Sequence, residues 1–263
     1  TRRSSDLLNG SARAASIDAA FLSETGCALH FINDTPGAIA HQIVPEGPGL
    51  APCANELERL NSAHGSDRPP GWVLGYVPDN DGDRGNLVFF DETIGLARQL
   101  EAQEVFALAV VAELSWLVYT GELEYDAHGA PTRRAAVVVN GPTSLRIDRI
   151  AEAFGVEVHR AEVGEANVVG RARELRAEGT LVRVLGEGSN GGNITFPSSV
   201  RDPLHTIHAV LKLLYAPGSS QSPSPAQIWL SRRGAPQSAE AAGQTTTLAA
   251  LIDTLPQIGR AHV

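Results

Sequence analysis

Apolar and polar positions alternate between two kinds of segment in the first part of the chain. Short apolar runs predict strands at 28–32, 72–77 and 87–90, while stretches with one apolar face predict helices at 14–25 and 55–64. Strands that alternate with helices are typical of a mostly parallel sheet covered by helices. The pattern therefore predicts an α/β domain.

The same alternation continues through the second part. Apolar residues at helical spacing predict a long helix over 96–118, and the uninterrupted apolar run 135–139 predicts a parallel strand buried on both faces. Further strands and helices are expected at 145–154, 156–158, 168–178, 181–185, 204–215 and 247–255. The fold class expected is α/β, as two consecutive α/β/α sandwich domains with mostly parallel sheets.

Composition narrows the possible functions. The net charge of −9 argues against general nucleic-acid binding, because phosphate backbones need a face of Lys and Arg. No apolar run approaches the roughly 20 residues of a membrane span, so no membrane association is expected. Cys27 and Cys53 are the only cysteines, too few for a disulfide framework or a cysteine-rich zinc site. Two reduced thiols in a cytoplasmic protein are expected.

Both ends of the sequence indicate a fragment. The chain begins at Thr1 and contains no methionine, so no natural start codon is in view. Residues 258–263 resemble one reading frame of a common sequencing adapter and are interpreted as an adapter-derived tail. This tail is left out of the fold prediction, and localisation cannot be read from this N-terminus.

The strongest local signal is an acidic turn that follows the strand predicted at 72–77. Asp79, Asp81 and Asp83 stand at alternating positions around Gly82, and three such carboxylates repel one another unless a cation neutralises them. Carboxylate oxygens on a tight turn suit Mg²⁺. A solvated acidic turn is the plain alternative, but a position at the carboxyl end of a strand favours a site.

Two other motifs can be compared with this turn. An EF-hand loop needs glycine at its sixth position and glutamate at its twelfth, where this chain has Arg84 and Phe90. A phosphatase of the haloacid dehalogenase type would use Asp79 as nucleophile and Asp81 as acid/base. That family normally has Thr or Val at position 83 and an acidic pair after its lysine, and both are missing here. The phosphatase remains the second enzymatic interpretation.

A glycine-rich loop follows the strand predicted at 181–185. Residues 186–191 match G-x-G-x-x-G, but the dinucleotide fingerprint needs a helix directly after the loop, and residues 192–197 look extended and end in proline. A carboxylate beside a hydroxyl suits neutral ligands instead: Glu187 can accept hydrogen bonds from two sugar hydroxyls, and Ser189 can donate or accept. By itself, an ordinary glycine turn explains the loop equally well.

Taken together, the two loops resemble the α-D-phosphohexomutase superfamily, the phosphoglucomutases and phosphomannomutases. Residues 79–84 are similar to the family's metal loop D-x-D-G-D-R, and residues 186–189 to its sugar loop G-E-x-S-G. Residues 248–256 are similar to the helix that closes the family's third domain. The resemblance implies that 1–92 is most of domain II and that 93–257 is domain III.

The resemblance also implies a function. The family interconverts hexose 1-phosphates and hexose 6-phosphates through a phosphoserine and a bisphosphorylated sugar of the glucose 1,6-bisphosphate type. It implies Mg²⁺ on the three aspartates of the acidic turn, a catalytic Arg84 beside them, and sugar hydroxyls on Glu187 and Ser189. Glu165 is a further expected substrate contact, acidic where the family often has a basic residue.

The family's phosphoserine lies in a T-A-S-H-N-P-like segment, and no such segment occurs in this sequence. Domains I and IV of the same polypeptide are therefore expected to be missing, and the chain alone is expected to show no mutase turnover. Small-molecule hexose phosphates are the expected partners. A non-catalytic sugar-phosphate-binding protein is the alternative from outside the enzymes.

Overall fold

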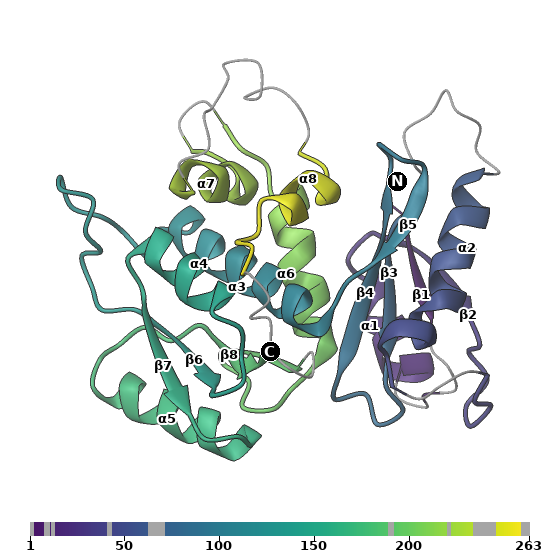
Figure 1. Ribbon diagram of the computed structural model, residues 1–263, viewed down its shortest axis with the longest axis horizontal. Helices are drawn as coiled ribbons and strands as arrows, with labels where there is room; N and C mark the ends of the chain where they lie inside the picture. Colours follow the sequence, from purple (N-terminus) through teal and green to yellow (C-terminus); the bar gives the residue numbers. More distant parts are fainter. Residues whose placement is uncertain are drawn as a thin grey trace. The chain divides into compact units, whose positions relative to one another are not determined.

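The computed structural model describes residues 3–7, 11, 14–40, 44–62, 72–188, 192–219, 222–233 and 246–258. The chain divides into two compact units (Figure 1). Unit 1 comprises Thr1–Val105 with Asp202–Leu204, and unit 2 comprises Phe106–Arg201 with His205–Val263.

Unit 1 contains a five-stranded sheet with the strand order β2-β1-β3-β4-β5. The pairs β1–β2 and β1–β3 are parallel, whereas β3–β4 and β4–β5 are antiparallel. The strands are β1 (Arg3–Leu7), β2 (Ala28–Ile32), β3 (Trp72–Pro78), β4 (Gly85–Asp91) and β5 (Leu96–Gln99). The helical segments are η1 (Ala14–Asp18), α1 (Ala19–Ser23), η2 (Gly47–Leu50) and α2 (Ala51–Ser62).

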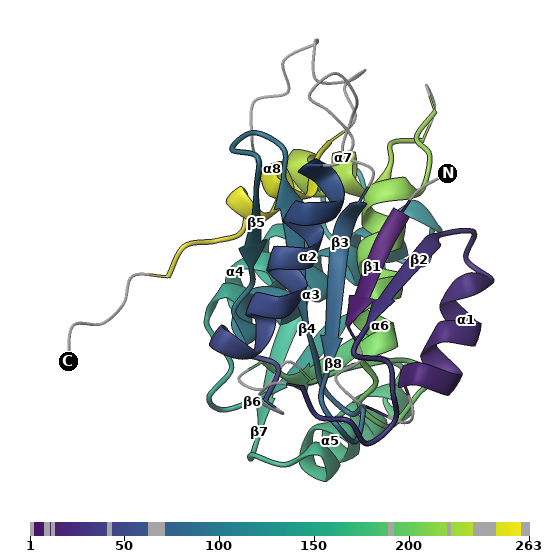
Figure 2. The same ribbon diagram turned by 90° about the vertical axis from the view of Figure 1, so that its right-hand side faces the viewer.

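Helix α2 covers one face of this sheet, as Figure 2 shows. Its apolar residues recur at helical spacing and pack on the inward residues of β3 and β4, forming a core of Leu50, Cys53, Ala54, Leu57, Trp72, Val77 and Val88. Both cysteines are thiols outside any disulfide, and the one on α2 is buried in this core. The core fixes the strand that runs into the acidic turn.

Unit 2 contains a four-stranded sheet with the strand order β7-β6-β8-β9. Its strands are β6 (Ala136–Asn140), β7 (Glu157–Ala161), β8 (Val184–Glu187) and β9 (Gly192–Thr195). Strands β7 and β8 both pair with β6 in parallel, and β9 pairs with β8 antiparallel. The central β6 is buried along its whole length, as its apolar run predicts.

Helices cover both faces of the second sheet. Figure 1 shows α5 on one face and α3, α4 and α6 on the other. The helices are α3 (Ala102–Tyr119), α4 (Arg146–Phe154), α5 (Glu165–Ala177), α6 (Pro203–Tyr215), α7 (Pro225–Arg232) and α8 (Leu248–Asp253). The face under α5 packs around Ala136, Val138, Val168, Val169, Ala172, Leu175, Val182, Leu185 and Ile194. This is the α/β/α sandwich expected of a mostly parallel sheet.

Helix α3 carries one buried charge in an apolar surround. The Glu113 carboxylate is 1% exposed and accepts from Lys212 Nζ of α6 at 2.5 Å and from Arg183 Nε, just before β8, at 3.0 Å. The Lys212 ammonium also lies 5.1 Å from the centroid of the Trp116 ring. Burial lowers the pKa of Lys212, and the adjacent Glu113 carboxylate opposes that shift. The cluster ties the central helix to both of its neighbours.

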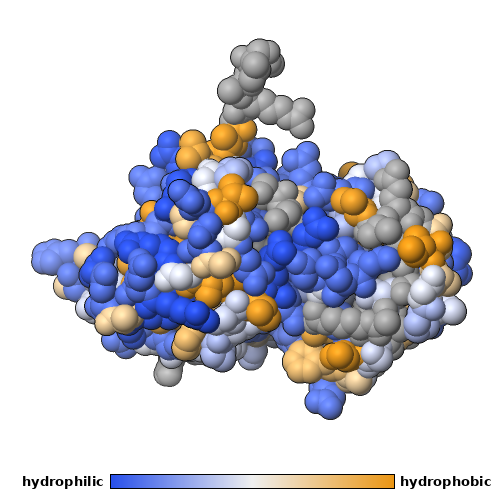
Figure 3. Space-filling model, turned by 90° about the horizontal axis from the view of Figure 1, so that it is seen from below, coloured by the Kyte–Doolittle hydropathy of each residue, from blue (hydrophilic) through white to orange (hydrophobic). Residues whose placement is uncertain are grey.

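Within the described part of the chain, α3 has the length and hydropathy of a membrane-spanning helix. Of its most apolar 18-residue window, 72% is buried inside the fold. The molecular face in Figure 3 is mainly hydrophilic, with hydrophobic side chains in small separate groups. Packing in the core of unit 2 accounts for the apolar surface of α3.

The α/β class predicted from the sequence is confirmed, with three local differences. Residues 96–99, predicted as the start of the long helix, form the edge strand β5, and the helix begins at Ala102. Helix α7 was not predicted, whereas β9 lies within residues 192–197, which were predicted to be extended. The sheet of unit 2 is mostly parallel, whereas that of unit 1 is half antiparallel because β3, β4 and β5 follow one another by hairpins. Of the expected tail 258–263, all but its first residue lies outside the described residues.

The buried side chain of Asn61 joins α2 to β3. Its amide donates to the carbonyl oxygens of Leu57 at 3.0 Å and Trp72 at 2.7 Å, and it accepts from Trp72 N at 3.1 Å. Asn61→Ala leaves two buried backbone groups of Trp72 without these partners, so we expect a loss of about 2–4 kcal/mol of unfolding free energy. Urea unfolding followed by tryptophan fluorescence measures the loss.

Ser62→Ala is the matched control, because it removes a hydrogen bond on the exposed side of the same helix turn. It should change the free energy of unfolding by less than about 0.5 kcal/mol. Equal stabilities of Asn61→Ala and Ser62→Ala would contradict the role assigned to the Asn61 side chain.

Candidate functional site

The acidic turn connects β3 and β4, whose last ladder pair is Pro78 with Gly85. Within the turn, Asp79 N donates to Arg84 O at 3.0 Å and Gly82 N donates to Asp79 O at 3.2 Å. Gly82 has φ +70°, a conformation that a residue with a Cβ adopts only at a cost. The glycine therefore lets the turn close tightly and hold its side chains on one loop.

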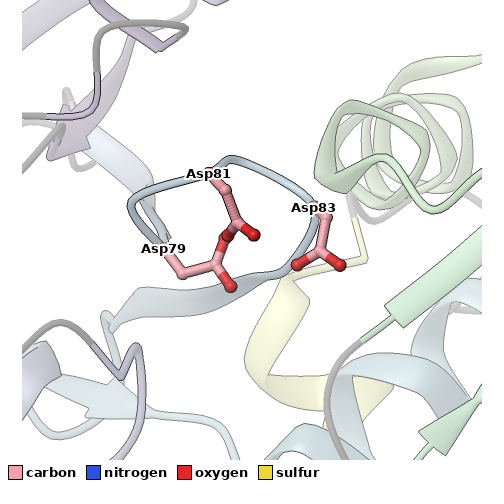
Figure 4. Close-up of side chains that lie close together, drawn as sticks. All are labelled: Asp79, Asp81 and Asp83. Carbon is pink, nitrogen blue, oxygen red and sulfur yellow. The ribbon is translucent and has the colours of Figure 1, made fainter.

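The three carboxylates of this turn lie together. Figure 4 shows the side chains of Asp79, Asp81 and Asp83 on one loop. One oxygen from each carboxylate can be chosen so that all three oxygens lie within 4.8 Å of one another. Asp79 is buried, Asp83 is partly buried and Asp81 is exposed, so the group opens to solvent on one side. The structure thus brings the three predicted metal ligands to one place.

Arg84 holds the buried member of the cluster. Its Nε donates to Asp79 Oδ2 at 2.7 Å, its backbone N donates to Asp79 Oδ1 at 3.1 Å, and Nε lies 3.5 Å from Asp83 Oδ1. Burial disfavours the charged guanidinium, but the interactions with Asp79 and its neighbours outweigh it, so the pKa of Arg84 is raised. One guanidinium among three carboxylates leaves a net charge of −2.

This donor set suits a hard divalent cation. Carboxylate oxygens close together, with a remaining negative charge and an open side, are what Mg²⁺ or a similar ion binds in proteins. The bonds from Arg84 use only part of the accepting capacity of the Asp79 oxygens, because each carboxylate oxygen accepts about two hydrogen bonds. The residues present therefore fit a cation at this turn.

A second polar group forms at the carboxyl edge of the sheet in unit 2. Because Val139 pairs with Gly186, the residues that end β6 and β8, Asn140 and Glu187, come side by side. Both are buried. Asn140 Nδ2 donates to Glu187 Oε1 at 3.0 Å, so the sheet register itself positions the carboxylate predicted to bind sugar.

The loop before α5 supplies another donor to the same carboxylate. Gly164 N donates to Glu187 Oε1 at 2.8 Å. Gly164 has φ +125°, and a Cβ there would also lie 3.3 Å from Asn167 Nδ2. The glycine is therefore needed for the amide to point at the carboxylate.

Arg201 bridges two carboxylates at this edge. Its Nε donates to Glu165 Oε2 at 2.9 Å, and its Nη1 lies 3.7 Å from Glu187 Oε2. The predicted residues Glu165 and Glu187 are thereby brought together. Two carboxylates and one guanidinium leave a net charge of −1, which favours neutral hydroxyls over another anion beside Glu187.

Arg160 of β7 braces the loop that follows β6. Its Nη1 donates to the carbonyl oxygens of Asn140, Gly141 and Thr143 at 3.3, 3.2 and 2.9 Å, and its Nη2 donates to Asp148 at 2.5 Å. Thr143 Oγ1 in turn donates to Asn140 Oδ1 at 2.6 Å and accepts from Gly188 N at 3.0 Å. The loop that follows β6 is thus held to β7 by Arg160 and to the end of β8 by Thr143.

The structure adds three residues that the sequence analysis missed: Asn140, Arg160 and Arg201. A polar residue at the end of the apolar run 135–139 is a usable signal for the first of them. The two arginines have no such signal, since their roles depend on contacts far along the chain. Ser189, predicted beside Glu187, lies outside the described residues. Asp79 and its neighbours belong to unit 1, and Glu187 and Glu165 belong to unit 2.

Solved structures with the same fold are phosphohexomutases. The chain is similar to a structure described as a putative phosphomannomutase from Thermus thermophilus, with TM-score 0.58 and 18% identity, covering 89% of this chain and 46% of that one. It is also similar to a phosphoglucomutase/phosphomannomutase family protein from Burkholderia thailandensis, with TM-score 0.57 and 16% identity, covering 91% and 44%. A phosphoglucomutase from Paramecium matches with TM-score 0.55 and 16% identity, covering 97% and 36%.

These identities show a shared fold, and this chain spans less than half of each of the three. Among proteins of curated function, none matches the sequence. The sequence itself matches one family model, described as phosphoglucomutase/phosphomannomutase, alpha/beta/alpha domain III, over residues 119–228. The resemblance to the superfamily is therefore confirmed: residues 119–228, which include the sugar loop, match domain III of the phosphoglucomutase/phosphomannomutase family, and the chain has the fold of the solved phosphohexomutases.

Proposed function

We propose that this chain carries the magnesium loop and the sugar loop of a phosphohexomutase. The reaction interconverts a hexose 1-phosphate and a hexose 6-phosphate through a phosphoserine and a bisphosphorylated sugar such as glucose 1,6-bisphosphate. No phosphoserine segment of the family's kind occurs in this sequence, so we propose that residues outside this sequence supply the serine. The single observation that carries the proposal is the cluster of Asp79, Asp81 and Asp83 held by Arg84.

In this proposal the three aspartates hold Mg²⁺, which when bound neutralises charge on the phosphoryl group during transfer. Arg84 orients the buried Asp79 carboxylate through two hydrogen bonds. Its remaining guanidinium nitrogens can donate to a phosphate oxygen, because a guanidinium offers five N–H groups in a fixed plane. Arg84 is therefore the residue of this loop proposed to contact the reacting phosphate.

Glu187 is proposed to accept hydrogen bonds from two sugar hydroxyls. It is held by Asn140, by Gly164 N and by the nearby Arg201, so it needs little reordering when a ligand binds. Ser189 is proposed as a second hydroxyl contact. Glu165 is proposed to act chiefly by holding Arg201. Arg201 then supplies a positive charge beside the position where the family often has a basic residue.

The phosphatase alternative is less well supported by the geometry. A nucleophilic Asp79 would need an oxygen free to attack phosphorus, yet its side chain is 1% exposed and Arg84 bonds to both oxygens. A non-catalytic sugar-phosphate-binding protein would use the same two loops. The mutase and the binding protein differ in one respect: only the mutase, once joined to a phosphoserine domain, turns over a hexose phosphate.

Removing one carboxylate from the acidic turn should weaken Mg²⁺ binding. Asp81→Asn is the sharpest change, because Asp81 is exposed and its substitution should leave the fold intact. We expect at least about a tenfold loss of Mg²⁺ affinity, since affinity at such sites follows the number of charged ligands. Isothermal titration calorimetry of the full chain with MgCl₂ measures it.

Asp34→Asn is the matched control, an exposed aspartate of unit 1 outside the turn. It removes the same charge and should change the affinity by less than about twofold. An equal loss in both variants would mean that Mg²⁺ responds only to the net charge of the chain, and the turn would not be a metal site.

Glu187→Gln should weaken the binding of a hexose phosphate. Glutamine preserves the shape but removes the charge that strengthens hydrogen bonds from hydroxyls, so we expect about a tenfold loss of affinity. Titration of the full chain with glucose 6-phosphate and, separately, mannose 6-phosphate measures this loss and compares the two sugars.

Glu174→Gln on the exposed side of α5 removes the same charge without touching the loop, and its affinity should match that of the unsubstituted chain. Circular dichroism checks that both variants are folded. Unchanged affinity in a folded Glu187→Gln variant would remove Glu187 from the proposed sugar site.

A further inference from the structure

A separate cavity in unit 2 is lined by residues of α4, α7 and the segment that follows α8, elements that Figure 1 labels. It has a volume of about 410 Å³, which suits a small molecule. Its lining consists of Arg149, Glu152, Ala153, Trp229, Arg232, Arg233, Pro256 and Gln257.

Positive charge dominates this lining. The lining includes three arginines and one glutamate, a net charge of +2 in a chain whose net charge is −9. Arg149 pairs with Glu152 at 3.1 Å on the surface, with both side chains about two thirds exposed. In the described residues, neither Arg232 nor Arg233 has a carboxylate within ion-pair distance. Arg232 and Arg233 lie at the C-terminal end of α7, where the helix dipole favours cations. The dipole of α7 does not explain why Arg149 of α4 lines the same cavity.

The apolar part of the lining includes Trp229, whose side chain is firmly held. The indole Nε1 of Trp229 donates to Thr254 Oγ1 at 2.7 Å, and its ring stacks on Phe154 with the centroids 6.1 Å apart. The Arg232 guanidinium lies 3.4 Å from the centroid of the Tyr125 ring, which orients it without neutralising it. A capping box formed by Ser224 and Gln227 fixes the start of α7. Side chains ordered in advance lose little entropy when a ligand binds.

The cavity is distinct from the polar group around Glu187. Helix α4 starts from the loop at the carboxyl end of β6 and ends beside the start of β7, so its later residues lie toward the opposite edge of the sheet. The family match also ends at Ile228, before Trp229, Arg232 and the segment after α8. Most of the lining therefore lies outside the residues that the family model matches.

We propose that this cavity binds a small, multiply charged oxyanion, of which pyrophosphate is the simplest phosphorus-containing example. Guanidinium groups bind phosphate oxygens through paired hydrogen bonds, and three of them around about 410 Å³ suit more than one anionic group. This site is independent of the proposed mutase function.

Calorimetric titration of the full chain with sodium pyrophosphate, in about 0.15 M salt without divalent cations, tests the site. Saturable binding of one pyrophosphate per chain is expected. The double variant Arg149→Gln/Arg233→Gln removes two exposed guanidinium groups and leaves the contact between Arg232 and Tyr125 in place. It should lose at least about tenfold in affinity, since hydrogen bonds to charged groups are among the stronger ones in proteins.

Arg171→Gln/Arg173→Gln is the matched control on α5, on the other face of the sheet. Arg171 pairs with Glu174 three residues later, as Arg149 pairs with Glu152, and Arg173 is exposed like Arg233. This pair should change the affinity by less than about twofold. Absence of saturable binding, or equal loss in the two double variants, overturns the proposal, because the second result leaves only long-range attraction.

Discussion

The pairing of β6 with β8 is the constraint on which the polar edge of unit 2 depends. With Val139 opposite Gly186, Asn140 and Glu187 end their strands together, and the amide donates to the carboxylate. A slip of one residue would turn each side chain to the other face of the sheet. The same register places Gly188 where its amide can donate to Thr143 in the loop after β6. It also places Glu187 where the amide of Gly164, just before α5, can donate to it. One strand pair thus fixes the surroundings of a buried carboxylate.

Unit 1 solves a similar problem with a hairpin. Strands β3 and β4 run antiparallel, so the chain must reverse within a few residues, and Gly82 permits the reversal. The cost of bringing three carboxylates together is offset by Arg84, which folds back on the residue that begins the turn. Both polar groups therefore rest on the same principle: a strand leads into an acidic residue, and a nearby arginine balances its charge.

Residues close together in the chain could be predicted well, and those joined across the chain could not. The acidic turn could be recognised because its three aspartates, glycine and arginine lie within six residues and follow an apolar run. The buried strand 135–139 was equally clear. The roles of Arg201 and Arg160 could not be predicted, because an arginine among polar residues is indistinguishable from a solvated surface residue until the fold brings its partners beside it.

The segment 96–99 was predicted wrongly for a related reason. Leu96 and Leu100 fit a helical spacing, but pairing with β4 makes the segment a strand. Tertiary pairing overrides such short local preferences.

The Glu113 cluster has a practical consequence for chemistry on this protein. Lys212 is the only lysine in the sequence, and it is held between the Glu113 carboxylate and the Trp116 ring. Acylating reagents need a free, unprotonated amine, whereas this ε-amine, on a side chain that is 22% exposed, is held in an ion pair with a buried carboxylate. The rate at which such a reagent labels this ε-amine therefore reports how often the ion pair between α3 and α6 opens. Mass spectrometry of the peptide that contains Lys212 would follow this opening without any engineered probe.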